Sequence, residues 1–492
     1  MLYFKQLTVA LSLILGVQSI AQENVFLKRD FWDSNPTIEN IDSKINQGCD
    51  IAQANSNNFD AVVYAILQDA PISTLQYIQS KPGNDVNKLT HDGRTYIFWA
   101  AYKGNVEFMK YLLKKGAKTD LTDDKGNTIL NFAAGSGQQN TKVYDLCLAN
   151  GANLKKDLTP NGANALLLAA PFDTDFKLTE YFISKGLDIK SEDAEGNNIF
   201  NYVSKTGNIN MLKQLINKGI KGTDNAFIFA AYGTRNNTNG LEFYQFLESV
   251  GLNPNTKNKD EITPLHIVAS RSQDLDIINY FISKENNVNQ TDKDGNTPFL
   301  NASSRNNIDV ITLLLKQVDD INLVNKKGES ALTLAVENNS NKIVELLIEK
   351  KANVSVLDAN GNNLAYYLIH SFNSEKIKDF ELKASLLKSH GLDLTSNQTN
   401  GNTLYHLAVE KNNLDLIQWV PNDKVDINAK NKEGNTALHL AAMNAKNTDI
   451  LKYLVSKGAK LNEVTEFEET AFDIASENEI LKTNNISIDF LK

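Results

Sequence analysis

The feature that most constrains the fold is a motif that returns about every 33 residues. An Asp or Asn, then a Gly, then a Ser, Thr or Asn keep the same spacing in four segments, 292–302, 325–335, 358–368 and 431–441. Gly295, Gly328 and Gly361 are 33 residues apart. A fixed period of this length is typical of a solenoid, which grows by adding units that bury their apolar faces against their neighbours.

Each unit reads as two helices joined by turns. The glycine can take positive φ in a tight turn. Thr263 and Pro264 then place a side-chain oxygen at a helix N-cap and a proline at the first helical position. Small residues such as Ala441 and Ala442 let neighbouring helices approach closely. The second helix has apolar residues three and four apart, as in 343–347, and typically ends at a glycine.

This order of residues, D-x-x-G-x-T-P-L-H-x-A-A followed by a Leu-Leu helix and G-A-D-V-N, resembles the ankyrin repeat. The best matches are Thr263–His266 and Thr436–Ala442. The resemblance implies an all-α fold, an ankyrin-repeat solenoid of paired antiparallel helices with hairpin-like loops. It also implies a concave groove lined by the first helices and the loop tips.

The register divides the chain into four parts. We expect a signal peptide at 1–21, an N-terminal capping region at 22–57 with a single helix, about twelve repeats at 58–462, and a degenerate C-terminal capping repeat at 463–492. The spacing shortens to 27 residues between Gly196 and Thr223 and lengthens to 40 between Gly361 and Gly401. We therefore expect a truncated loop at the sixth unit and an insertion in the tenth, with an irregular groove at both places.

The N-terminus and the charge balance predict where the protein acts. Residues 1–21 carry one charge, Lys5, then an apolar run and a small-residue ending, which is typical of a cleaved signal peptide. We expect a periplasmic or secreted monomer with no membrane span after cleavage, because a spanning helix needs roughly 20 apolar residues.

The net charge of -9 disfavours nucleic acid as a partner. Cys49 and Cys147 fall in units too far apart for a disulfide.

No residue pattern for catalysis stands out. His266, His406 and His439 occupy the T-P-L-H position, where the resemblance implies a bond to nearby backbone, and roughly 8 to 10 Å between units is too far for one metal. Acidic pairs such as Asp123-Asp124 read as solvated turns. The nucleophile elbow, the phosphate-binding glycine loop and the metal-binding helix pair do not occur. We therefore predict no enzyme activity, cofactor or metal.

The candidate contact residues lie just after the small-residue pair, at the groove end of the first helix, where the resemblance places partner-reading side chains. They are Tyr102, Phe172, Tyr232, Arg271, Arg305 and His370. Aromatic residues and arginine are enriched in interface hot spots. The first hypothesis is an exported scaffold that binds another protein, or a protective binder such as an immunity protein or a factor that shields an enzyme.

The alternative is a glycan or small-ligand binder that uses groove aromatics. One repeat position is aromatic in most of the first six units, and its residues are Tyr64, Trp99, Phe132, Leu168, Tyr202 and Phe229. Because the same position is leucine in the best-matching units, we interpret these rings as core. Solvent exposure of Trp99 and Tyr202 would favour the alternative.

Overall fold

The computed structural model describes residues 24–235, 237–421 and 424–492, so the expected signal peptide lies outside the described residues. Within these ranges the chain is an all-α repeat solenoid: twelve helix pairs follow one another from α3/α4 to α25/α26, and α27 and α28 form a further pair. The only β structure in the same ranges is four isolated bridges in the loops, such as that between Val324 and Ser330. The chain forms two compact units, and the second begins at Val203.

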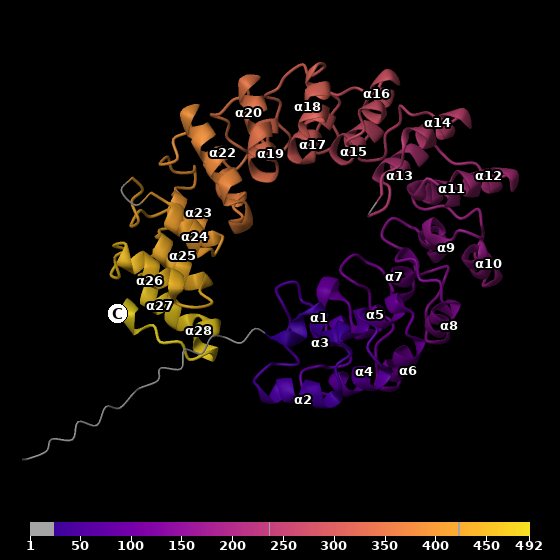
Figure 1. Cartoon of the computed structure of the whole chain (residues 1–492), viewed down its shortest axis with the longest axis horizontal. Coiled ribbons are helices and arrows are strands. Elements are labelled where there is room, and N and C mark those ends of the chain that lie inside the picture. Colours follow the sequence, from indigo (N-terminus) through magenta and orange to yellow (C-terminus); the bar gives the residue numbers. More distant parts are fainter. Residues whose placement is uncertain (1–23, 236, 422–423) are drawn as a thin grey trace, which may run out of the picture. The chain divides into compact units, whose positions relative to one another are not determined.

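In the first unit, the first helices of successive pairs pack against one another, and so do the second helices: α3, α5, α7 and α9 form one series, and α4, α6 and α8 the other (Figure 1). Its elements are η1 (Val25–Leu27), α1 (Arg29–Asp33), α2 (Ile38–Asn46), α3 (Ala61–Leu67), α4 (Ile72–Gln79), η2 (His91–Gly93), α5 (Tyr96–Lys103), α6 (Val106–Lys114), α7 (Ile129–Gly135), α8 (Thr141–Ala149), α9 (Ala165–Ala169), η3 (Ala170–Phe172), α10 (Lys177–Ser184) and α11 (Ile199–Val203), whose last residue belongs to the second unit.

The N-terminal region holds one more helix than the sequence indicated. Helix α2 begins with a capping box in which Thr37 and Asn40 satisfy each other's backbone N–H groups. In front of it, α1 packs against α3 and carries Trp32, which is fully buried. The Trp32 Nε1–H donates to the carbonyl of Phe26 at 2.9 Å. The end of the first helix stack is therefore covered by an aromatic plug.

The second unit repeats the same packing, with α13, α15, α17, α19, α21, α23, α25 and α27 in one series of first helices. Its elements are η4 (Ser204–Thr206), α12 (Ile209–Asn217), α13 (Ala226–Tyr232), α14 (Leu241–Ser249), α15 (Pro264–Arg271), α16 (Leu275–Ser283), α17 (Pro298–Arg305), α18 (Ile308–Leu315), α19 (Ala331–Asn338), α20 (Asn341–Glu349), α21 (Leu364–His370), η5 (Ser374–Lys376), α22 (Ile377–Ser389), α23 (Leu404–Glu410), α24 (Leu414–Trp419), α25 (Ala437–Asn444), α26 (Asp449–Ser456), α27 (Ala471–Glu477), α28 (Glu479–Thr483) and η6 (Asp489–Leu491).

The loops explain why the motif opens with Asp or Asn. The Asp292 carboxylate accepts hydrogen bonds from the backbone N–H groups of Asp294 and Asn296, at 2.9 and 2.8 Å. Successive loops then bond each other, since the N–H of Lys326 donates to the carbonyl of Asp294 and the N–H of Ala359 to that of Lys327. At the equivalent donor position of the fourth loop stands Pro160, which has no N–H, so this bond cannot form there.

The expected insertion in the tenth repeat lies between α21 and α22, and α22 is lengthened to 13 residues. Its Lys383 is almost fully buried. The Lys383 Nζ donates to the carbonyl of Val336, near the end of α19, and pairs with Asp379 at 3.1 Å. In the eighth and ninth repeats, Asn306 and Asn339 play this part instead. Their side-chain amides donate to the carbonyls of Ala269 and Ser303, which hold the position of Val336 in the preceding first helices. The insertion therefore changes how a first helix is capped, and it keeps the stack continuous.

Candidate functional site

In the first unit, Tyr102 is the exposed edge of an aromatic cluster. Its ring lies 5.9 Å from that of Phe132 in a stacked arrangement and 6.4 Å from that of Trp99, edge to face. The Arg94 guanidinium covers the Phe132 ring at 4.1 Å. A partner that contacts Tyr102 would therefore press against a preordered surface, which lowers the entropic cost of binding.

Arg94 holds this cluster in place, and sequence reasoning missed it. Its Nε and Nη2 donate to one carboxylate oxygen of Asp123 at 3.0 and 2.9 Å, and its Nη1 lies 3.0 Å from Asp92. Asp123 is buried, so its interpretation as part of a solvated turn was wrong, whereas its neighbour Asp124 is exposed. The signal in the sequence was the arginine itself, because it departs from the repeat pattern. The third, fifth and eighth repeats carry Asn127, Asn197 and Asn296 at this loop position.

Phe172 lies at the end of η3 and is exposed. Its ring lies against the backbone of Gly137 in the preceding repeat, because a Cβ built on Gly137 would be 2.8 Å from the Phe172 Cγ. The φ of Gly137 is also +81°, which favours glycine. Phe172 and Tyr102 thus both project from the first unit, each held by a contact with a neighbouring repeat.

In the second unit, the structure brings two predicted contact residues together. Tyr232 at the end of α13 is 41% exposed, and Arg271 at the end of α15 reaches back to donate from Nη2 to the carbonyl of Thr234 at 3.2 Å. Partial burial, followed by the charge of Asp260, raises the pKa of the Tyr232 phenol, and the nearby Arg271 opposes that rise. Arg305 is exposed at the end of α17, one repeat further along the same helix series.

His370 ends α21 and is half-buried. Its ring centroid lies 4.1 Å from that of Tyr366, and its Nδ1 is 2.9 Å from the Tyr366 carbonyl. Because one ring nitrogen is used inside the helix, only the other is available to a partner. Met443 is exposed at the equivalent place in the twelfth repeat. The sequence analysis did not select it, because the selection was limited to aromatic residues, arginine and histidine.

The rings at the repeat position of Trp99 and Tyr202 do not form an exposed surface for a ligand. Trp99 is 6% exposed and Tyr202 is 3% exposed, so the observation that would favour a glycan binder is not met. The Trp99 Nε1–H donates to Thr90 Oγ1 at 2.8 Å, and the Tyr202 hydroxyl donates to Asp193 at 3.0 Å. Each ring therefore anchors the first residue of its own loop. Phe229 is half-buried, with the Lys205 Nζ 5.1 Å from its ring centroid.

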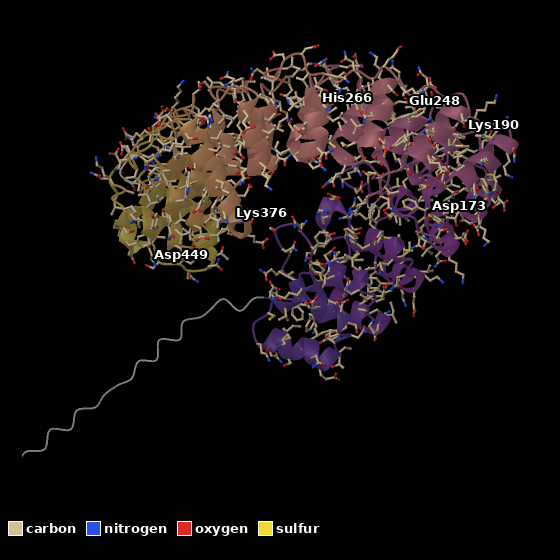
Figure 2. The ribbon with its side chains drawn as sticks, turned by 45° about the horizontal axis from the view of Figure 1, so that its top comes forward. Asp173, Lys190, Glu248, His266, Lys376 and Asp449 are labelled. Carbon is tan, nitrogen blue, oxygen red and sulfur yellow. The ribbon has the colours of Figure 1, made fainter. Side chains whose placement is uncertain are left out.

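The T-P-L-H histidines bond backbone, as predicted. His266 lies in α15 (Figure 2). Its Nδ1 accepts from the N–H of Thr263 at 3.2 Å, and its Nε2 lies 3.1 Å from the Asn296 carbonyl in the next loop. His406 makes the same pair of contacts in its repeat. His439 Nδ1 also accepts from the N–H of its threonine N-cap, but its Nε2 lies 2.9 Å from the Glu463 carbonyl, at a different position of the next repeat. Burial lowers the pKa of all three imidazoles, which are therefore neutral ties between repeats.

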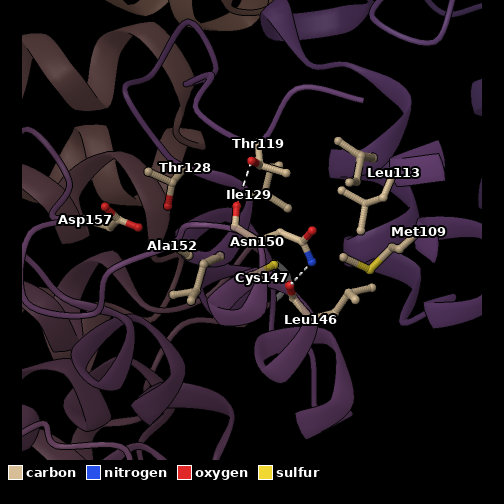
Figure 3. Close-up of a pocket in the computed structure, with 12 residues that line it drawn as sticks. Met109, Leu113, Thr119, Thr128, Ile129, Leu146, Cys147, Asn150, Ala152 and Asp157 are labelled. Atoms are coloured by element: carbon tan, nitrogen blue, oxygen red, sulfur yellow. Dashed lines mark hydrogen bonds between the residues drawn. The ribbon is translucent and has the colours of Figure 1, made fainter. Parts of the chain in front are cut away.

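Two cavities lie near residues already described. The cavity beside Cys147 has a volume of about 20 Å³ and is lined mainly by apolar groups such as Met109 and Leu113 (Figure 3); it is large enough for a single water. Burial raises the pKa of the Cys147 thiol to about 12. A polar cleft of about 420 Å³ lies at the insertion, between Glu337, Lys376 and Lys383. In the described part of the chain, no cluster of three His, Cys, Asp or Glu side chains could hold a metal.

These features define a class of protein: a repeat solenoid of helix pairs, with hydrogen bonds between successive loops and exposed side chains at the ends of its first helices. A family model for ankyrin repeats in three copies matches residues 51–157, 227–324, 301–380 and 374–465, which together exceed half of the chain. The protein belongs to the ankyrin-repeat family. None of the described helices is both long and apolar enough to cross a membrane.

Several proteins match parts of the chain. The phosphocholine transferase AnkX of Legionella pneumophila is 27% identical over 184 residues, which are 37% of this chain and 18% of that protein. The palmitoyltransferase AKR1 of Lachancea kluyveri is 30% identical over 178 residues, 35% of this chain and 24% of that protein. The fem-1 homolog A-like protein of Mus musculus is 32% identical over 104 residues, 20% and 15% respectively. The chain thus spans less than a quarter of the length of these relatives.

Proposed function

We propose that the protein is an exported interaction scaffold or protective binder, which holds a partner protein against the exposed ends of its first helices. The observation that carries this proposal is the row Tyr232, Arg271 and Arg305, which presents an aromatic ring and two guanidinium groups from three adjacent repeats. Such side chains provide most of the energy in protein interfaces. Tyr102 and Phe172 in the first unit, and His370 in the second, are further contact residues.

A second part of the proposal concerns catalysis. The transferase names belong to relatives of which the chain matches 18% and 24%, and the matched segments are repeats. We propose that this chain binds without catalysis, cofactor or metal, acts as a monomer in that contact, and does not bind nucleic acid. A net charge of -9 supports the last point, because it repels a phosphate backbone.

Export remains a proposal that follows from residues 1–21. It would place the chain in the periplasm or outside the cell, where an immunity or enzyme-shielding role is the specialised form of the same binding. Mass spectrometry of the mature chain should find its first residue at Gln22, and fractionation should find it outside the cytoplasm. A chain that keeps Met1 in the cytoplasm would contradict export while leaving the binding proposal intact.

The test of binding is crosslinking and affinity capture from envelope extract, followed by affinity measurement with the captured protein. Arg271→Glu combined with Arg305→Glu should weaken that affinity at least about tenfold, because both guanidinium groups are replaced by repelling charge. The matched control is Lys342→Glu with Lys388→Glu, which makes the same charge change on the second helices α20 and α22. Equal losses in both double variants would contradict this surface.

The glycan alternative makes the opposite prediction. Trp99→Ala would leave a stable protein that has lost a sugar or other small ligand, because the ring would then be a contact surface instead of core. The 6% exposure of Trp99 weighs against that result.

A further inference from the structure

The loop before α27 ends the series of loops with an unusually exposed apolar side chain. Phe467 is 84% exposed, the largest value among the bulky apolar residues of the described chain. Glu466, Glu468 and Glu469 surround it in the sequence, and all three are exposed. An exposed phenyl ring among carboxylates costs solvation free energy in isolation, so a partner that buries it gains that free energy back.

The loop that carries Phe467 is firmly held. Thr465 is buried at its base, and its N–H donates to the carbonyl of Glu469 at 2.9 Å. The Thr465 Oγ1 accepts from the N–H of Phe467 at 3.2 Å, and Lys430 Nζ donates to the carbonyl of Val464 at 2.8 Å. Phe467 is therefore presented at the tip of an ordered loop, which lowers the entropic cost of inserting it into a partner.

A complementary surface lies on the same unit. A mainly apolar cleft of about 500 Å³ is found at the carboxyl ends of α18 and α20. Its lining consists of Thr312, Leu315, Lys316, Val318, Asp319, Ile321 and Lys350. Lys316 and Lys350 are both exposed, and Asp319 is the single acidic group of the lining, so the lining side chains themselves carry a net positive charge.

We propose that Phe467 of one copy of this chain inserts into the Leu315–Ile321 cleft of a second copy, with Glu466 and Glu468 facing Lys316 and Lys350. An aromatic ring buries roughly 150–250 Å², which the cleft can accommodate. Opposite charges around an apolar anchor favour this pairing over an unrelated apolar surface.

The contact has to be between copies. Three complete helix pairs, from α21/α22 to α25/α26, lie between the cleft and the Phe467 loop (Figure 1). At roughly 8 to 10 Å per packed helix, the loop cannot reach the cleft of its own chain. Each copy therefore offers one loop and one cleft, and such a head-to-tail contact extends into a row of copies wherever it does not close on itself into a ring.

The size of the contact makes it weak. A stable interface buries on the order of 1,200 Å² or more, and one ring with its charged neighbours falls well below that value. The association is thus concentration-dependent. Because Tyr232, Arg271 and Arg305 belong neither to the cleft nor to the Phe467 loop, it is tested separately from the proposed partner binding. A row of copies would multiply the groove and raise the avidity for a partner that offers repeated sites.

Sedimentation equilibrium of the purified full chain tests the proposal, with its N-terminus processed as in the cell. The mass should rise continuously with concentration up to the millimolar range, and less at high salt, since exposed charges are screened. Phe467→Ser should weaken association at least about tenfold, as should Lys316→Glu with Lys350→Glu. The matched control is Leu357→Ser, which changes an exposed apolar residue of another loop and should have no effect.

Mixing decides between this contact and any other. Phe467→Ser chains keep the cleft, and Lys316→Glu/Lys350→Glu chains keep the loop, so an equal mixture should form dimers and stop there. Adding Glu466→Lys and Glu468→Lys to the chain with the reversed cleft should restore the rise in mass. A wild-type chain of constant mass at all concentrations, a mixture that stays monomeric, or an unaltered Phe467→Ser variant would each overturn the proposal.

Discussion

The substitution Gly328→Ala tests whether adjacent loops touch as the structure places them. Gly328 has a φ of +77°, and a Cβ built there would lie 2.7 Å from the carbonyl carbon of Asp358, and closer still to the amide nitrogen of Ala359. That nitrogen makes the interloop hydrogen bond, donating to the carbonyl of Lys327 at 2.8 Å. The added methyl group therefore has to push the two loops apart.

The cost can be built from three contributions. A left-handed conformation costs a non-glycine residue about 1–2 kcal/mol. Loss of one hydrogen bond costs about 0.5–1.5 kcal/mol. Overpacking against a neighbour that cannot move freely costs about 1–3 kcal/mol. Together these place the loss in the free energy of unfolding at roughly 3–5 kcal/mol, because the contributions overlap in part.

Two variants in the same unit separate these contributions. Gly391 has a φ of +100°, but a Cβ there would meet no atom within 4 Å, so Gly391→Ala should cost only the conformational strain of about 1–2 kcal/mol. Glu329→Val changes the neighbour of Gly328 without any positive φ. It removes one hydrogen bond from Asn325 Nδ2 to the Glu329 carboxylate and should cost about 1 kcal/mol or less.

Urea unfolding followed by tryptophan fluorescence is the appropriate assay. Trp419 in α24 reports on the same unit as Gly328, whereas Trp32 and Trp99 report on the first unit and give a signal common to all variants. The midpoint should fall most for Gly328→Ala and clearly less for Gly391→Ala and Glu329→Val. Equal midpoints for the two glycine variants would refute the close approach of the loops. Equal midpoints for Gly328→Ala and Glu329→Val would refute the loop register itself.

Three further predictions concern the interior. Trp99→Ala should cost roughly 3–5 kcal/mol in urea unfolding, because burial is lost and a cavity forms; a stable variant would contradict a core role. The folded state holds the pKa of His266 below 6.5, so the unfolded state binds the proton first, and stability should fall as the pH drops from 7 to 5 by up to about 1.4 kcal/mol per pH unit; a His266→Asn variant should lose less over that range, and an equal loss would contradict this assignment. Thiol titration should find Cys49 and Cys147 unreactive in the native monomer and both free after unfolding without reductant, and a disulfide within the monomer would refute the repeat register.

Stability and binding should respond to different residues. Changes at Tyr102 and Tyr232 should leave the free energy of unfolding within roughly 0.5 kcal/mol while they alter partner affinity. Phe229 is half-buried, so Phe229→Ala should cost less than Trp99→Ala. A variant at Tyr232 that unfolds as readily as Trp99→Ala would place Tyr232 in the core and remove it from the contact surface.

Local rules account for most of what could be predicted. The period of the motif, the threonine N-caps and the turn glycines act within a few residues of one another, so the sequence alone determines helix pairs, their register and the role of His266. The outward position of Tyr102, Phe172 and Arg305 also follows from their place in the repeat, because within each unit the first helices pack in one series.

Contacts between repeats were decided only by the tertiary structure. Asp123 is buried because Arg94 of the preceding loop reaches it, and neither residue reveals the other in a sequence read one unit at a time. Lys383 is buried because the inserted segment carries it to the end of α19. The apolar cleft near Leu315 likewise needs two neighbouring repeats to exist. A repeating sequence specifies its units through local conformational preference, whereas burial and charge pairing across units depend on which irregular residues the stacking brings face to face.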